Sequence, residues 1–135
     1  MQESTTASSR PWPFKWFGIF RSSTDPPSLF PRFDEFVDPD WLPYDKNQIV
    51  LYLATAPMVL TTSLPDTECE ICKSILTVGT FRSDGEWLWP DNLAHFVGHH
   101  NIVLPDEMVN KIRAMNYIAP ANCDKSFESL PWPRM

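Results

Sequence analysis

A chain of 135 residues is long enough for one small domain, and its 43% hydrophobic content can supply a core. Its formal charge of −6 excludes nucleic acid as the expected partner, because binding phosphates requires a basic face. Fourteen prolines against four glycines argue against long regular elements, and no apolar run approaches the ~18 residues of a membrane span.

The first 30 residues are expected to form a flexible or extended N-terminal arm. Residues 1–9 are small and polar, which predicts a tail, and residues 22–31 have the composition of a linker. Between them, residues 10–21 form an aromatic cluster with three positive charges. This cluster is either a docking peptide for a partner protein or a membrane surface, or a segment that folds back over the chain's own core. Folding back is favoured, because exposed aromatic clusters are rare on soluble monomers.

Helical patterns occur in three stretches: residues 44–56, a stretch opened by Pro90 and Asp91, and residues 104–115. Asp45 and Asp91 are the candidate caps of the first two helices, and Pro57 ends the first. The third has an acidic first turn and a basic last turn, which suits the helix dipole.

Strand-like runs surround a tight-turn signal. Residues 75–81 and 86–89 are separated by Ser83-Asp-Gly85, which predicts a β-hairpin, and residues 58–62 predict a further strand. These elements predict an α+β domain over residues 31–118, with a β-hairpin and two to three short helices, stabilised by zinc. Residues 119–135 are rich in proline and predict an irregular tail.

The cysteines indicate both a compartment and a metal. The chain has three, of which Cys69 and Cys72 stand at metal-ligand spacing and Cys123 has no evident partner. Secreted domains tend to use even sets of cysteines, and the N-terminus lacks the apolar region of a signal peptide. We therefore expect an intracellular protein, cytoplasmic or organellar.

Cys69 and Cys72 can present two thiolates to one zinc ion, and histidines on the following helix can complete four ligands. The spacer between Cys72 and His95 has 22 residues, longer than in DNA-reading fingers, which predicts a structural site within a domain. His95 and His99 share a face of a regular helix. His95 and His100 also fit if the helix ends near Asn101, and the second pair is favoured because His100 shares the apolar stripe.

Four patterns together resemble a group of small zinc-finger-like proteins: Cys69-x-x-Cys72, Asp84-Gly-x-Trp-x-Trp-Pro90, Leu93-Ala-His-aromatic-Val-x-x-His100 and Leu104-Pro. The resemblance covers about residues 40–115 and leaves the aromatic N-terminal segment unmatched. It implies a metal site, carries over His95 and His100 rather than His99, and implies no particular activity. The chain departs from the group at Lys73, where glycine commonly follows the second cysteine, and at Phe96, which replaces tyrosine. Neither departure removes a ligand.

These features predict a non-catalytic protein in which structural Zn²⁺, bound by Cys69, Cys72, His95 and His100, fixes a small fold. Its partner is expected to be another protein, contacted through the aromatic segment 10–21 or the acidic surface. Trp87 and Trp89 lie on one face of a strand, where their rings either cover the hydrophobic core or form a platform on which a ligand stacks.

Two alternatives involve nucleic acid. A hairpin followed by His99-His100-Asn101 is compatible with a metal-dependent nuclease of the ββα type, and the metal ligands are compatible with a zinc finger that binds nucleic acid. Both require a basic approach for the phosphates, which this acidic chain offers poorly.

Overall fold

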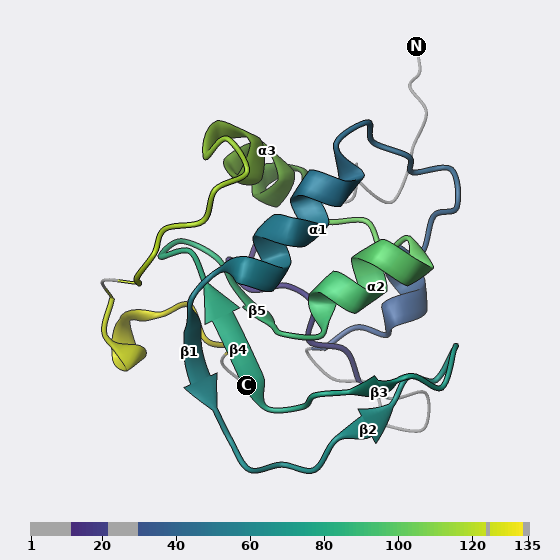
Figure 1. The fold of residues 1–135 in the computed structure, drawn as a ribbon, viewed down its shortest axis with the longest axis horizontal. Coiled ribbons are helices and arrows are strands. Elements are labelled where there is room, and N and C mark those ends of the chain that lie inside the picture. Colours follow the sequence, from purple (N-terminus) through teal and green to yellow (C-terminus); the bar gives the residue numbers. More distant parts are fainter. Residues whose placement is uncertain (1–11, 22–29, 124, 134–135) are drawn as a thin grey trace.

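The computed structural model describes residues 12–21, 30–123 and 125–133. These residues form an α+β domain, as predicted, with three α-helices and two small antiparallel sheets (Figure 1). The helices are α1 (Lys46–Thr55), α2 (Leu93–His100) and α3 (Asp106–Ala114). The strands are β1 (Met58–Thr61), β2 (Thr67–Glu68), β3 (Ile75–Leu76), β4 (Thr80–Ser83) and β5 (Leu88–Pro90). Short 3-10 helices span Phe33–Phe36 and Phe127–Ser129. The expected polar tail, residues 1–9, and most of the expected linker, residues 22–31, lie outside the described residues.

The predicted hairpin is formed by β4 and β5, which pair antiparallel in a sheet of order β1-β4-β5. The Asp84 carboxylate closes its turn, because Oδ1 accepts the backbone N–H of Glu86 at 3.0 Å and that of Trp87 at 2.8 Å. Gly85 has a φ of 93°, which glycine adopts without steric cost. The Asp-Gly pair therefore forms the tight turn that its sequence predicts.

The run from Ile75 to Phe81, predicted as one strand, is divided at Gly79. This residue has a φ of 86°, and a Cβ there would collide with the Thr62 hydroxyl. The chain bends at the glycine, so that β3 leaves the main sheet and pairs with β2, whereas β4 pairs with β1. The single strand of the prediction is therefore wrong, because one glycine between two β-forming runs ends the regular extended backbone.

The two faces of the main sheet bury different clusters. Trp87 and Trp89 join residues of all three helices in the larger cluster, and Trp89 Nε1 donates to the Leu53 carbonyl at 3.0 Å. Leu88, between them, belongs to a second cluster with Trp16 and Leu130. This division follows from the alternation of side chains along a strand. Because Trp87 and Trp89 are 1% and 0% exposed, they form core, as favoured from the sequence, and offer no stacking platform.

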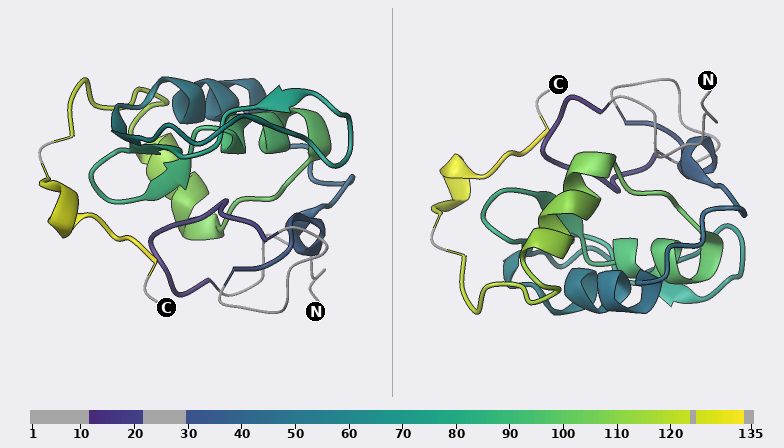
Figure 2. Two further views of the ribbon diagram at one scale, coloured as in Figure 1. Left: turned by 90° about the horizontal axis from the view of Figure 1, so that it is seen from below. Right: turned by 90° about the horizontal axis from the view of Figure 1, so that it is seen from above.

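The described part of the aromatic N-terminal segment, residues 12–21, folds back onto the domain, which is the second of the two alternatives for this segment. The Phe17 N–H donates to the Leu88 carbonyl and the Leu88 N–H to the Lys15 carbonyl, each at 3.0 Å. The segment thereby covers the outer edge of β5 in a parallel arrangement. Trp16 and Phe17 are buried, one in each cluster. Figure 2 shows the segment in purple on the side of the molecule opposite α1.

Neither predicted helix cap makes a capping hydrogen bond. Asp45 stands at the N-cap position of α1, but its carboxylate accepts from Arg113 at 2.8 and 3.0 Å and from the Tyr117 hydroxyl at 2.6 Å. Asp91 lies one residue before the N-cap of α2, and its carboxylate pairs with Arg82 at 2.6 Å. Arginine side chains from other elements hold both carboxylates, and each arginine supplies the opposite charge that a backbone N–H lacks.

The helices are short, and α1 has ten residues. Among the described residues, no helix is long and apolar enough to cross a membrane. Helix α3 begins two residues later than predicted and carries acidic residues in its first turn and basic residues in its last, as expected.

Candidate metal centre

Four side chains from two distant parts of the chain converge at one end of the molecule. Cys69 and Cys72 lie on the connection between β2 and β3, and His95 and His100 lie on α2. Cys69 Sγ is 3.4 Å from His100 Nε2, and Cys72 Sγ is 3.4 Å from His95 Nε2. One ligand atom from each of the four residues lies within 4.8 Å of all the others. The four side chains that the sequence singled out are therefore together, in a group that can hold a metal ion.

The cysteine connection is a tight turn. The Lys73 N–H donates to the Cys69 carbonyl at 3.0 Å, and the Cys69 N–H donates to the Ser74 carbonyl at 2.8 Å. The Ile71 N–H points at Cys69 Sγ across 3.4 Å, as a donor to a thiolate would. Lys73 has a φ of 65°, in the left-handed region. This conformation explains why glycine suits the position after the second cysteine, and Lys73 adopts it at a cost of about 1 kcal/mol.

The histidines are oriented by the end of α2. Leu93 and Val97 bury one side of the helix, and Asn101 ends it with a φ of 51°. The Asn101 amide nitrogen lies 3.3–3.5 Å from the carbonyl oxygens of three residues before α1, and its Oδ1 accepts from Lys46. These three residues are Asp38, Pro39 and Trp41. His100 therefore comes from a helix end that is held in place by side-chain bonds.

The sequence signalled only part of this arrangement. A helix end near Asn101 was considered from the sequence, but the side-chain bonds from Asn101 to residues 38–41 were not predicted. They join segments about 60 positions apart, for which spacing and composition carry no signal.

The surroundings favour the ligand forms of these groups. Burial lowers the pKa of His95 and of His100; His100 and His99 lower that of His95 further, and His99 lowers that of His100 further. The Ser74 hydroxyl, 3.3 Å from Cys72 Sγ, is the largest cause that lowers the pKa of the Cys72 thiol. Metal binding requires neutral imidazole and deprotonated thiol. Each shift therefore favours the form that coordinates.

The donor set and its spacing fit zinc. Two sulfur and two nitrogen donors are a common structural set, and bond lengths of ~2.3 Å to sulfur and ~2.0 Å to nitrogen give a tetrahedron with edges of roughly 3.3–3.8 Å. The two sulfur–nitrogen distances of 3.4 Å lie in that range. All four ligand atoms lie within 4.8 Å of one another, which exceeds the longest edge of that tetrahedron by about 1 Å.

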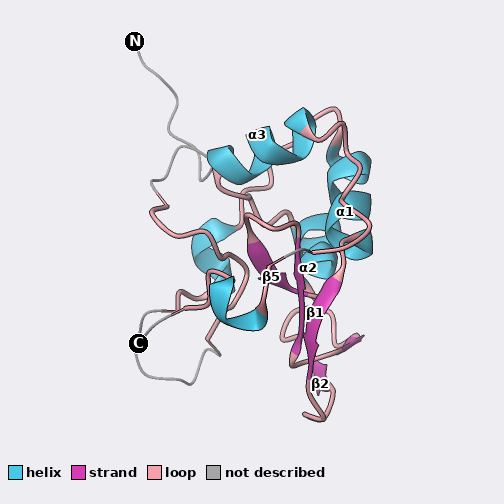
Figure 3. Ribbon diagram, turned by 90° about the vertical axis from the view of Figure 1, so that its left-hand side faces the viewer, coloured by secondary structure: helices cyan, strands magenta, loops and turns pink. Residues whose placement is uncertain are grey.

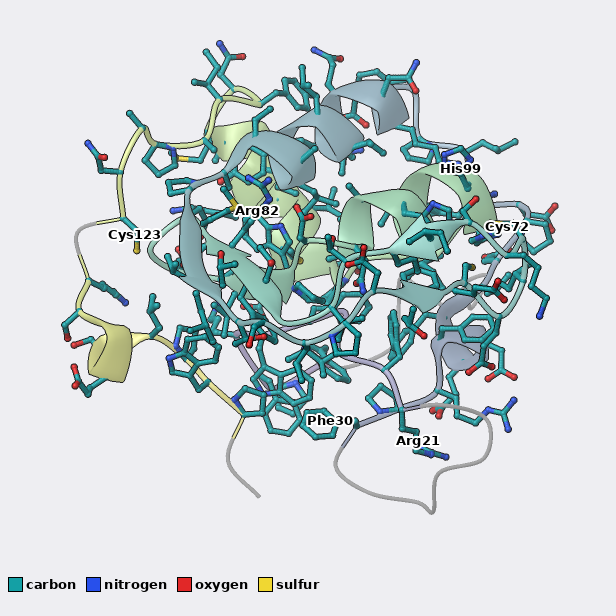
Figure 4. All side chains as sticks on the ribbon, turned by 60° about the horizontal axis from the view of Figure 1, so that its bottom comes forward. Arg21, Phe30, Cys72, Arg82, His99 and Cys123 are labelled. Carbon is teal, nitrogen blue, oxygen red and sulfur yellow. The ribbon has the colours of Figure 1, made fainter. Side chains whose placement is uncertain are left out.

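The remaining histidine and the remaining cysteine lie outside the group. His99 is exposed, with its ring centroid 4.8 Å from that of His95. Cys123 is partly buried and packs against the second hydrophobic cluster. Figure 4 shows Cys123 and Cys72 at opposite ends of the molecule, with His99 at the end of Cys72. Within the described part of the chain, Cys123 is therefore no alternative ligand.

Comparison with family models, with curated proteins and with solved structures found no match to this chain. Its functional assignment therefore depends on the geometry of the four converging side chains.

Proposed function

We propose that this chain is a structural-zinc protein that acts without catalysis, as an interaction module or a subunit of a larger complex. The observation that carries the proposal is the convergence of Cys69, Cys72, His95 and His100 at one point. Their ligand atoms come from an exposed two-stranded ribbon, β2–β3, and from a helix packed on the core, α2. Zinc bound there would fasten the ribbon to the helix.

The donor set supports a structural rather than a catalytic zinc. Four protein ligands complete the tetrahedral coordination of zinc and leave no position for water or substrate. The ββα-nuclease alternative requires such an open position as well as a basic approach for phosphates. The acidic residues Glu68 and Glu70 flank Cys69 instead, and both are exposed.

The interaction role is supported by apolar side chains on the same ribbon. Ile71 and Ile75 are 45% and 65% exposed, one within the cysteine turn and one at its end. Zinc would fix these side chains relative to the rest of the domain. Because Trp16 and Phe17 of the N-terminal segment are buried, the ribbon offers more accessible apolar surface to a partner protein than these two residues do.

Zinc content tests the proposal. We expect native mass spectrometry and elemental analysis to find one zinc per chain in the purified protein, and cobalt substituted for zinc to show the absorption of a tetrahedral site with two sulfurs. Cys69→Ser should lose the metal, and Cys123→Ser, the matched control, should retain it. Equal zinc content in both variants, or none in the unmodified protein, would contradict the site.

The nucleic-acid alternatives have their own test. A nuclease would cleave plasmid DNA when supplied with zinc or magnesium, and a zinc finger that binds nucleic acid would retain DNA in a salt-dependent manner. We expect neither from the zinc-loaded protein.

A further inference from the structure

The longest uncharged stretch of the described chain lies on its surface. From Asn47 to Pro65, nineteen consecutive residues include no Asp, Glu, Lys, Arg or His, although 21% of the chain is charged. Eleven of the nineteen are exposed, so burial does not account for the lack of charge. The stretch comprises α1, β1 and the connection that follows β1. Leu51 on the outer side of α1 and Met58 at the start of β1 are each 60% exposed.

Strand β1 forms one margin of the main sheet. In the described part of the chain it pairs with β4 alone, which leaves its second edge open. Figure 3 shows the molecule from the side on which β1 lies. Proteins usually protect such an edge with charged side chains, proline or a covering segment. The strand, Met58-Val-Leu-Thr61, has no charge and no proline.

The opposite margin of the same sheet is already covered. There the segment around Trp16 pairs with Leu88 of β5, as described above. One open edge therefore remains in the described sheet, and it coincides with the uncharged surface.

We propose that β1 is the interface of a two-fold symmetric dimer, in which the β1 strands of two copies pair antiparallel. The two three-stranded sheets then form one continuous sheet, with the outer faces of the two α1 helices beside the junction. An antiparallel pair of identical strands obeys a two-fold axis, so each copy offers and receives the same bonds. The assembly closes, because neither three-stranded sheet then retains an open edge among the described residues.

The net charge of the chain and the lack of charge on this surface together favour a second copy as the partner that pairs with β1. Each chain carries a formal charge of −6, so two copies repel each other wherever acidic surfaces meet. The surface from Asn47 to Pro65 lets them approach without placing like charges opposite one another. Its exposed apolar side chains, Leu51 and Met58, are covered in the same step.

The hydrogen bonds of β1 identify a residue whose substitution affects the open edge and not the edge paired with β4. The Thr62 N–H donates to the Gly79 carbonyl at 3.1 Å, toward the main sheet. Backbone groups of successive strand residues point in opposite directions, so the Thr61 N–H points to the open edge. Thr61→Pro therefore removes a donor from the interface and none from the bonds between β1 and β4, at an edge position where proline is tolerated.

Analytical ultracentrifugation of the full chain tests the dimer. We expect the unmodified protein to sediment at twice the 15.6 kDa mass of the chain. Thr61→Pro should sediment as a monomer with an unchanged circular dichroism spectrum. Leu51→Glu alters a helix surface rather than the strand, and it should also sediment as a monomer with an unchanged circular dichroism spectrum. This variant still tests the dimer if Thr61→Pro fails to fold. Ile118→Glu is the matched control, because Ile118 is 68% exposed but lies outside the uncharged stretch, and it should remain a dimer.

Two results would overturn the proposal. One is an unmodified protein that is monomeric at every concentration at which it stays soluble, which would leave a strand of another protein as the candidate occupant. The other is a dimer that persists in both Thr61→Pro and Leu51→Glu, which would place the interface elsewhere.

Discussion

His100 reaches the candidate metal centre although it lies five residues after His95, where a regular helix would favour His99. The helix ends directly after His100, at Asn101 in the left-handed conformation, whose N–H bonds to the Phe96 carbonyl five residues back rather than four. His95 and His100 each approach one cysteine sulfur at 3.4 Å, whereas His99 is exposed. The apolar side of the helix favoured His100 from the sequence, and the four-residue spacing favoured His99; zinc binding by each histidine decides between them.

This geometry predicts that two of the three histidines are needed for zinc binding and the third is not. His95→Ala and His100→Ala should each lose zinc, because each removes one of four ligands. His99→Ala should retain zinc and change the free energy of unfolding by less than about 1 kcal/mol, as exposed substitutions usually do. Zinc titration of the three variants measures this, and loss of zinc in His99→Ala with retention in His100→Ala would reverse the assignment.

At the scale of elements, Asp45 joins the start of α1 to the end of α3. Its side chain is fully buried, and Arg113, which is 38% exposed, binds both of its oxygens. The hydrogen bonds from Arg113 are the largest cause that lowers the pKa of Asp45 to about 2, and the Tyr117 hydroxyl adds to them. A carboxylate that would be costly to bury alone is thereby stabilised.

The lowered pKa predicts a loss of stability in acid. An unfolded aspartate has a pKa of ~3.9, so the contribution of Asp45 is complete above about pH 5 and is lost as the pH falls toward 2. We expect it to be roughly 1–2 kcal/mol, since Arg113 is partly exposed to solvent. Denaturant unfolding between pH 6 and 3 should show a shallower pH dependence in Asp45→Asn than in the unmodified protein. Asp40→Asn, at an exposed carboxyl, controls for the loss of one charge.

The β2–β3 ribbon is the element that depends most on the metal. Between Thr61 and Thr77, only Cys69 and Leu76 are buried, so few apolar contacts hold this region to the core. From the sequence, zinc is expected to fix a small fold, which implies that loss of metal would unfold much of the domain. The tertiary structure favours a local effect, because the larger hydrophobic cluster contains none of the four candidate ligands.

Chelation of the metal should therefore release the ribbon and leave the core folded. Hydrogen exchange followed by mass spectrometry should show faster exchange in peptides covering residues 62–78, with little change in α1. Unfolding of α1 on chelation would show instead that the core requires the metal, as the sequence suggested.

At the scale of the whole molecule, the N-terminal aromatic segment connects the two hydrophobic clusters. Phe17 belongs to the larger cluster and Trp16 to the smaller, on opposite faces of the sheet. Between them the backbone pairs with β5. The segment is therefore part of the fold rather than an appendage.

Phe17→Ala tests this role. Phe17 is fully buried against Phe36 and Phe20, so the substitution should lower the free energy of unfolding by about 3–5 kcal/mol, through lost transfer energy and a cavity. Leu42→Ala, at a side chain that is 74% exposed, should change it by less than about 0.5 kcal/mol. Equal effects of the two substitutions would mean that the segment does not pack in solution as described.

Much of the local structure was predictable because its signals are local. The Asp84-Gly85 turn, the three helices and the spacing of Cys69 and Cys72 depend on residues close together in the sequence. The apolar side of α2, from which His100 was favoured over His99 as a ligand, is likewise a local signal.

Contacts between distant segments were decided only by the tertiary structure. The covering of β5 by the N-terminal segment, the pairing of Asp45 with Arg113 and that of Asp91 with Arg82 each join separate elements. Composition can show that an aromatic cluster needs burial, or that an aspartate needs a partner, but it does not say which of several competing partners comes within reach. Packing makes that choice for the two aspartates, which arginine side chains bind in place of the predicted cap bonds. The bend at Gly79 makes it for the strands, because it separates β3 from β4.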